Sequence, residues 1–154
     1  MIGIILTGHG SFASGLNSAL ELIAGKQKEF EVVDFKREDS VAVLEANLSA
    51  ALDRLRNCDE IAFLTDLAGG SPFKNSATLS LSQKKGKSFV IAGTNLGMLL
   101  GISMSRDTYN IEGLKQLAVE LGTSSVKIYE TTVRKNEDNE AEVSVATETS
   151  AEGI

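Results

Sequence analysis

The chain has 154 residues, of which 42% are hydrophobic and 23% charged, as in a soluble globular domain with a sizeable core. Its formal net charge is −6, and the part before Arg134 is close to neutral, so no basic surface for nucleic acid is expected. The single cysteine, Cys58, excludes an internal disulfide, and no apolar run approaches the roughly 20 residues of a membrane-spanning helix. We therefore expect a cytoplasmic protein.

Short runs of β-branched and aliphatic residues predict β-strands along the chain. These runs are Ile2–Leu6, Phe30–Asp34, Ile61–Thr65, Ser88–Ala92 and Val126–Tyr129. Between them lie segments with apolar residues at helical spacing, which predict Phe12–Ala24, Val41–Leu55, Phe73–Leu81, Leu96–Met104 and Ile111–Leu121 as helices. We expect Ser40 to cap the second helix, and Gly25 and Gly122 to end the first and the last.

Strands that alternate with helices of about 10–15 residues favour an α/β fold, a doubly wound and mostly parallel sheet with helices on both faces. We expect one domain over residues 1–133 and an acidic, mobile tail over 134–154, within which Val143–Val145 can pair locally. Ligands bind such sheets at the carboxyl ends of the strands. Three candidate loops lie there: Thr7–Ser11, Asp66–Pro72 and Gly93–Asn95.

His9, the only histidine of the chain, lies between Gly8 and Gly10 where the first predicted strand ends. The glycines leave both sides of the imidazole free of side chains, and the helix that follows offers N–H groups to an anion. One hypothesis is a nucleotide-binding module, because Gly8–Ala13 fits the G-x-G-x-x-G/A pattern and Asp34 follows at about the ribose-binding spacing of ~20 residues. Against it, a histidine is not what a pyrophosphate-binding turn requires.

Asp66 follows the third predicted strand, which can lie beside the first. A carboxylate there would accept a hydrogen bond from one imidazole nitrogen of His9 and leave the other nitrogen as a nucleophile. Gly69, Gly70 and Ser71 would supply backbone and hydroxyl donors for an anion at the start of the next helix. The sequence contains neither a P-loop lysine nor a metal-binding cluster of carboxylates, so we expect no cofactor and no metal.

Three ordered motifs resemble the mannose-family EIIA component of the bacterial phosphoenolpyruvate:sugar phosphotransferase system over roughly residues 1–129. They are Leu-Thr-Gly-His-Gly around His9, Thr-Asp-Leu-Ala-Gly-Gly-Ser-Pro-Phe around Asp66, and Gly-Thr-Asn-Leu from Gly93. The resemblance implies a homodimer that exchanges its last, antiparallel strand. It also implies a phosphohistidine relay, in which HPr phosphorylates Nε2 of His9 and His9 passes the phosphoryl group to a histidine of EIIB.

The resemblance further assigns a role to each candidate residue. His9 and Asp66 would be catalytic, with Asp66 orienting the imidazole, and the phosphoryl group would be held by Gly10, Gly69, Gly70 and Ser71. EIIB is expected on a separate chain, and the membrane would be reached only through the EIIC/EIID transporter. The opening motif and the terminal Glu-Gly-Ile are similar to the N-acetylgalactosamine branch. A regulatory protein whose phosphorylated state is read by a partner would use the same His9, so that alternative stays open.

Overall fold

The computed structural model describes residues 1–82, 86–130, 132–133 and 143–144. The elements are, in chain order, β1 (Ile2–His9), α1 (Phe12–Ala24), β2 (Phe30–Phe35), α2 (Val41–Arg54), β3 (Glu60–Thr65), α3 (Ser71–Ser82), β4 (Ser88–Ile91), α4 (Leu96–Ser105), α5 (Ile111–Ser124), β5 (Thr132–Val133) and β6 (Val143–Ser144). None of the helices in these ranges combines the length and the apolar character that crossing a membrane requires.

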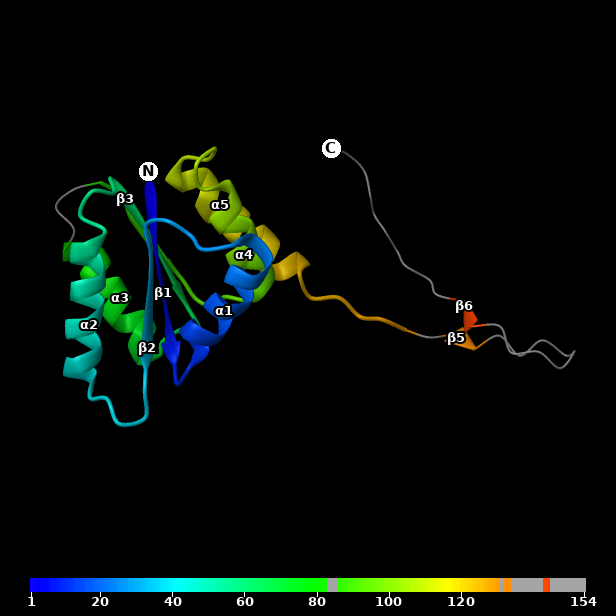
Figure 1. Ribbon diagram of the computed structural model, residues 1–154, viewed down its shortest axis with the longest axis horizontal. Helices are drawn as coiled ribbons and strands as arrows, with labels where there is room; N and C mark the ends of the chain where they lie inside the picture. The colour runs from blue at the N-terminus through cyan, green and yellow to red at the C-terminus, as the bar shows by residue number, and fades with distance from the viewer. Residues whose placement is uncertain (83–85, 131, 134–142, 145–154) are drawn as a thin grey trace, which may run out of the picture.

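The first four strands form a parallel sheet in the order β2-β1-β3-β4. Helices α2 and α3 cover one face, whereas α1, α4 and α5 cover the other (Figure 1). This arrangement confirms the predicted α/β fold with helices on both faces. Because β1 pairs with both β2 and β3, the residues that follow these three strands meet at one edge of the sheet.

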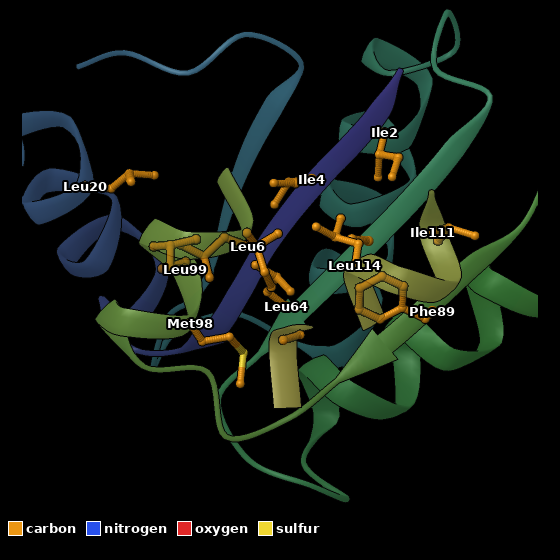
Figure 2. Packing of buried hydrophobic residues seen from close by; sticks show 14 residues of the cluster. Ile2, Ile4, Leu6, Leu20, Leu64, Phe89, Met98, Leu99, Ile111 and Leu114 are labelled. Carbon is orange, nitrogen blue, oxygen red and sulfur yellow. The ribbon is translucent and has the colours of Figure 1, made fainter. Parts of the chain in front are cut away.

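Alternating residues of β1 enter two separate hydrophobic clusters. Ile4 and Leu6 pack with Leu64 of β3 and Leu99 of α4 on one face (Figure 2), and Ile5 lies in the cluster on the other face. All of these side chains are fully buried, and each stabilises the fold by about 1.5–3 kcal/mol relative to an exposed position. The strand that ends in His9 is therefore held from both sides.

Helix ends follow the predicted caps in two cases. Ser40 Oγ accepts a hydrogen bond from the backbone N–H of Val43 at 3.3 Å, so Ser40 caps α2. Gly25 ends α1 with a positive φ of 74°, and its N–H donates to the carbonyl of Glu21. Both residue types suit these positions, because serine accepts at helix starts and glycine tolerates a left-handed φ at helix ends.

Gly122 does not end the last helix, so that prediction was wrong. Helix α5 continues to Ser124, and a Cβ atom at Gly122 would lie 2.5 Å from Cε of Met98 in α4. A Cβ at Gly101 of α4 would likewise collide with Leu121 of α5. The glycines permit the close approach of α4 and α5, and their role is packing.

The predicted strand Val126–Tyr129 is absent from the single chain. The side chains of Val126, Ile128 and Tyr129 are exposed, and the segment leads away from the sheet after α5 (Figure 1). A strand needs a neighbouring backbone to pair with, and this segment has none among the described residues. Within the four-stranded sheet, β4 is an edge strand that pairs only with β3.

Two short strands follow this segment. Thr132–Val133 pairs antiparallel with Val143–Ser144, which confirms the predicted local pairing for these two residues of the tail. Val145 and the predicted mobility of the rest of 134–154 lie outside the described residues.

Candidate active site

His9 is the last residue of β1, at the carboxyl edge of the sheet. Gly10, with a φ of +61°, turns the chain from β1 towards α1. A Cβ atom at Gly8 would collide with the ring of Phe12 and lie 3.0 Å from Cγ of Asp66, so only glycine fits between them. The imidazole itself stays accessible, with 46% of its side chain exposed.

Asp66 directly follows β3 and contacts both the main chain and the ring of His9. Its Oδ2 atom accepts a hydrogen bond from the backbone N–H of His9 at 2.8 Å and lies 2.7 Å from Nδ1 of the imidazole. Its Oδ1 atom accepts from the N–H of Leu67 at 2.7 Å. Because an ionised carboxylate only accepts hydrogen bonds, Nδ1 carries the proton, and in the neutral imidazole Nε2 then keeps a free lone pair.

The pKa of the Asp66 carboxyl reflects opposing influences. Partial burial raises this pKa, but hydrogen bonds from the backbone N–H and imidazole of His9 and from the N–H of Leu67 stabilise the charged form. Together with the charge of His9 they outweigh burial, so the pKa lies below its usual value. Asp66 therefore stays ionised at neutral pH.

We expect the stability contributed by Asp66 to be lost in acid. A carboxyl with a lowered pKa in the folded state contributes fully above its unfolded pKa, near 3.9, and loses the contribution as the pH falls through the folded value. Urea unfolding measured from neutral pH to about pH 2.5 gives the free energy of unfolding at each pH. This free energy should fall more steeply with decreasing pH in the wild type than in Asp66→Asn. Asp59→Asn removes a carboxylate that is 86% exposed, and its 3.5 Å ion pair with the N-terminal ammonium is of the exposed kind that contributes little, so this variant should behave as the wild type. Parallel curves for the wild type and Asp66→Asn would contradict the prediction.

The loop after Asp66 brings Gly70 against the imidazole. Gly69 has a φ of +78°, and Gly70 closes the turn by donating its N–H to the carbonyl of Leu67 at 3.2 Å. A Cβ atom at Gly70 would lie 2.8 Å from Cε1 of His9 and 3.6 Å from Nε2. The absence of a side chain at Gly70 thus leaves room for the ring and for whatever Nε2 carries.

Ser71 is the first residue of α3 and half-buried. The carbonyl of Gly70 accepts the N–H of Lys74 at 2.9 Å, so Gly70 occupies the capping position of α3. Ser71 follows the glycine that contacts His9. Its neighbour Pro72 is the second helical residue, where its missing N–H costs no hydrogen bond.

The third candidate loop supports the second. Gly93 donates its N–H to the carbonyl of Asp66 at 2.8 Å, and Thr94 donates to the carbonyl of Thr65 at 3.1 Å. Asn95 caps α4 by accepting from the N–H of Met98 at 2.9 Å. The loop thus fixes the backbone that carries Asp66.

Sequence reasoning missed the contribution of β2. The ring of Phe35 lies 5.7 Å from the imidazole of His9 between centroids, and the carbonyl of Phe35 accepts the N–H of Gly10 at 2.8 Å. The predicted strand stopped at Asp34, one residue short of this contact. Aligning the ends of the first two strands would have found it, because Phe35 is the register partner of His9.

The nucleotide-binding alternative is not favoured. Oδ1 of Asp34 accepts the backbone N–H of Ser14 at 3.0 Å instead of facing a ribose site beside Gly8. Asp34 also borders a hollow of about 390 Å³ between β2 and α2, but neither Gly8 nor Gly10 lines that hollow. In the described part of the chain, no three histidine, cysteine or acidic side chains are grouped so as to hold a metal ion.

The chain is similar to known proteins over most of its length. The family model described as PTS system fructose IIA component matches residues 3–119. The mannose-specific EIIAB component of Escherichia coli K12 is 32% identical over 127 residues, which are 82% of this chain and 39% of that protein. The fructose-specific EIIA component of Bacillus subtilis is 27% identical, with 74% of this chain and 77% of that protein covered.

A solved structure of a related protein has the same fold. The crystal structure of the phosphotransferase system component EIIA from Streptococcus agalactiae matches with a TM-score of 0.77 and 32% identity, covering 83% of this chain and 97% of that one. The chain spans about two fifths of the length of the E. coli EIIAB protein. The N-acetylgalactosamine branch stays a prediction. With a family model that spans both site loops and relatives of the same type, the chain belongs to the fructose and mannose IIA family of the phosphotransferase system.

Proposed function

We propose that the chain is a phosphoryl carrier, a phosphotransferase that accepts a phosphoryl group from phospho-HPr on Nε2 of His9 and passes it to a histidine of EIIB for sugar uptake. The observation that carries the proposal is the 2.7 Å contact between Nδ1 of His9 and Oδ2 of Asp66. It leaves Nε2 as the free nucleophile on a ring that is nearly half exposed.

The transfer needs no other reactant than the two histidines. The lone pair of Nε2 attacks phosphorus, a new N–P bond forms, and the N–P bond of the donor breaks with its electron pair returning to the donor imidazole. The proton on Nδ1 of His9 stays towards Asp66, whose negative charge offsets the positive charge that the ring gains. Transfer to EIIB is the same step with His9 as the donor.

The phosphoryl group would be held by Gly10, Gly69, Gly70 and Ser71. Gly70 lies against the imidazole edge near Nε2, and Ser71 begins α3, whose N-terminal N–H groups carry a partial positive charge. Positive φ values at Gly10 and Gly69 turn the backbone on either side of the ring. These features favour an anion beside Nε2.

The experiment is phosphorylation of the purified chain with phosphoenolpyruvate, enzyme I and HPr, followed by addition of EIIB. We expect one acid-labile phosphate per chain on the peptide that contains His9, no label in His9→Ala, and chase of the label onto EIIB. Label that persists in His9→Ala would overturn the proposal. Label on His9 that no EIIB accepts would instead support the regulatory alternative.

We further propose a homodimer in which residues 126–129 add an antiparallel strand to the β4 edge of the partner. Val126, Ile128 and Tyr129 are exposed, and β4 pairs only with β3 in the single chain. Exposed apolar side chains on an extended segment and an open sheet edge each gain from such pairing.

Replacing Ile128, which is 85% exposed, with lysine should weaken this dimer, because the apolar side chain could no longer be buried against a partner. Sedimentation velocity over a dilution series measures the change. Leu81→Lys is the matched control, since Leu81 of α3 is 89% exposed but lies outside the segment. A monomeric wild type, or equal dissociation of the two variants, would contradict the exchange.

The remaining assignments rest on the same family membership. We propose that the protein acts in the cytoplasm and meets the membrane only through the EIIC/EIID transporter. We propose residues 1–133 as the phosphocarrier domain, with the acidic stretch 134–154 after it.

A further inference from the structure

Helix α1 is capped by a residue from another strand. Ser11 precedes the helix, but its side chain accepts no capping hydrogen bond from the described residues. Oδ1 of Asp34, at the end of β2, accepts the N–H of Ser14 at 3.0 Å. Ser14 is the third helical residue, whose N–H an N-cap side chain ordinarily takes. Asp34 thus supplies from β2 the hydrogen bond that Ser11 does not make.

This cap lies beside the site, because only Gly10 and Ser11 separate α1 from His9. The next residue of β2, Phe35, accepts the N–H of Gly10 and places its ring 5.7 Å from the imidazole. Two consecutive residues of β2 therefore hold the Gly10 turn, the first turn of α1 and one face of His9. Asp66 holds the ring and main chain of His9 from β3, on the other side of β1.

We propose that Asp34 is a positioning residue for phosphoryl transfer. By fixing the first turn of α1, its carboxylate oxygen holds Gly10 in its left-handed conformation and keeps His9 in the orientation in which Nδ1 faces Asp66. It acts as a hydrogen-bond acceptor, so its charge is not required. The expected effect of Asp34 on the rate of transfer rests on the proposed function. Its expected effect on the orientation of the imidazole rests on the hydrogen bonds alone.

The test compares Asp34→Ala with Asp34→Asn, which retains an acceptor oxygen. The matched control is Asp39→Ala, because Asp39 is also half-buried and its Oδ2 accepts the N–H of Lys36 at 2.9 Å in the turn after β2, not an N–H of α1. Ser14→Pro removes the N–H donor and leaves Asp34 in place, and proline is tolerated in the first turn of a helix. Rapid-quench phosphorylation by phospho-HPr gives the maximal rate and the half-saturating donor concentration, and ¹⁵N spectra of the imidazole give the tautomer.

We expect Asp34→Ala and Ser14→Pro to lower the maximal rate about tenfold at an unchanged half-saturating concentration, with a mixed tautomer of His9. Asp34→Asn and Asp39→Ala should stay within about twofold of the wild type. Asp34→Ala equal to Asp39→Ala, or Asp34→Asn as slow as Asp34→Ala, would overturn the proposal. If Asp34→Ala does not fold, Ser14→Pro decides in the same way. If the wild type accepts no phosphate, the proposed function fails, and the imidazole spectra still decide whether Asp34 orients His9.

Discussion

Asp66→Asn should slow phosphorylation of His9 by roughly 10³-fold while the fold is retained. An asparagine side chain can turn its NH₂ group towards Nδ1, which would then accept a hydrogen bond and leave the proton on Nε2, the nitrogen that must attack phosphorus. Replacing the orienting aspartate of a catalytic triad in this way lowers kcat by about 10⁴-fold. We expect a smaller loss here, because the imidazole is nearly half exposed and the other tautomer is more easily reached.

The measurement is single-turnover transfer from phospho-HPr, with the ¹⁵N spectrum of the imidazole recorded on the same variant. A shift of the proton from Nδ1 to Nε2 together with the slower transfer would link the rate to the tautomer. Asp59→Asn is the control, because it changes an exposed carboxylate that precedes β3, whereas Asp66 follows the strand. An unchanged rate in Asp66→Asn would remove the orienting role of Asp66.

Gly70→Ala should slow transfer by about 10²-fold with little change in the unfolding free energy. Its Cβ would lie 2.8 Å from Cε1 of His9, closer than van der Waals contact, so the ring must move. A displacement of about 1 Å in a reacting group costs rates of this order. The backbone at Gly70 does not have a left-handed φ, so its conformation suits alanine, and the contact of the added Cβ with the ring is closer than its 3.3 Å contact with the carbonyl oxygen of Leu67.

Gly15→Ala is the matched control for this substitution. A Cβ at Gly15 meets nothing within 4 Å, and alanine inside a helix is about 1 kcal/mol more favourable than glycine. Gly15→Ala should therefore stabilise the chain and transfer phosphate at the wild-type rate. A wild-type transfer rate in Gly70→Ala as well would contradict the prediction that a side chain at position 70 displaces the imidazole.

The sequence predicted most elements because their signals are local. Ser40 before an apolar helical face and glycine after Ala24 define helix ends through contacts a few residues away. The pairing of His9 with Asp66 was also accessible, because parallel strands bring their carboxyl ends to one edge. That inference needed β3 to lie beside β1, which the sheet order provides.

The errors concern contacts between elements distant in sequence. Gly122 follows the last apolar residue of a helical segment, as a glycine that ends a helix would. Its lack of a side chain instead makes room for Met98 of α4. Residues 126–129 alternate as a strand would, but alternation does not say whether a partner backbone exists within the chain. Asp34 follows the Gly8–Ala13 motif at about the spacing of a ribose-binding residue. Only the structure reveals that its Oδ1 atom accepts a hydrogen bond from the N–H of Ser14.

One carboxylate oxygen binds His9 twice, through its main chain and through its ring. The orientation of the imidazole is therefore fixed relative to the backbone of β1. This strand pairs with β2 on one side and β3 on the other. A carrier that alternates between two partners benefits from this arrangement, since loading and unloading require no rearrangement around the ring. Each partner therefore meets the imidazole in the same orientation, which Asp66 and the backbone of β1 set together.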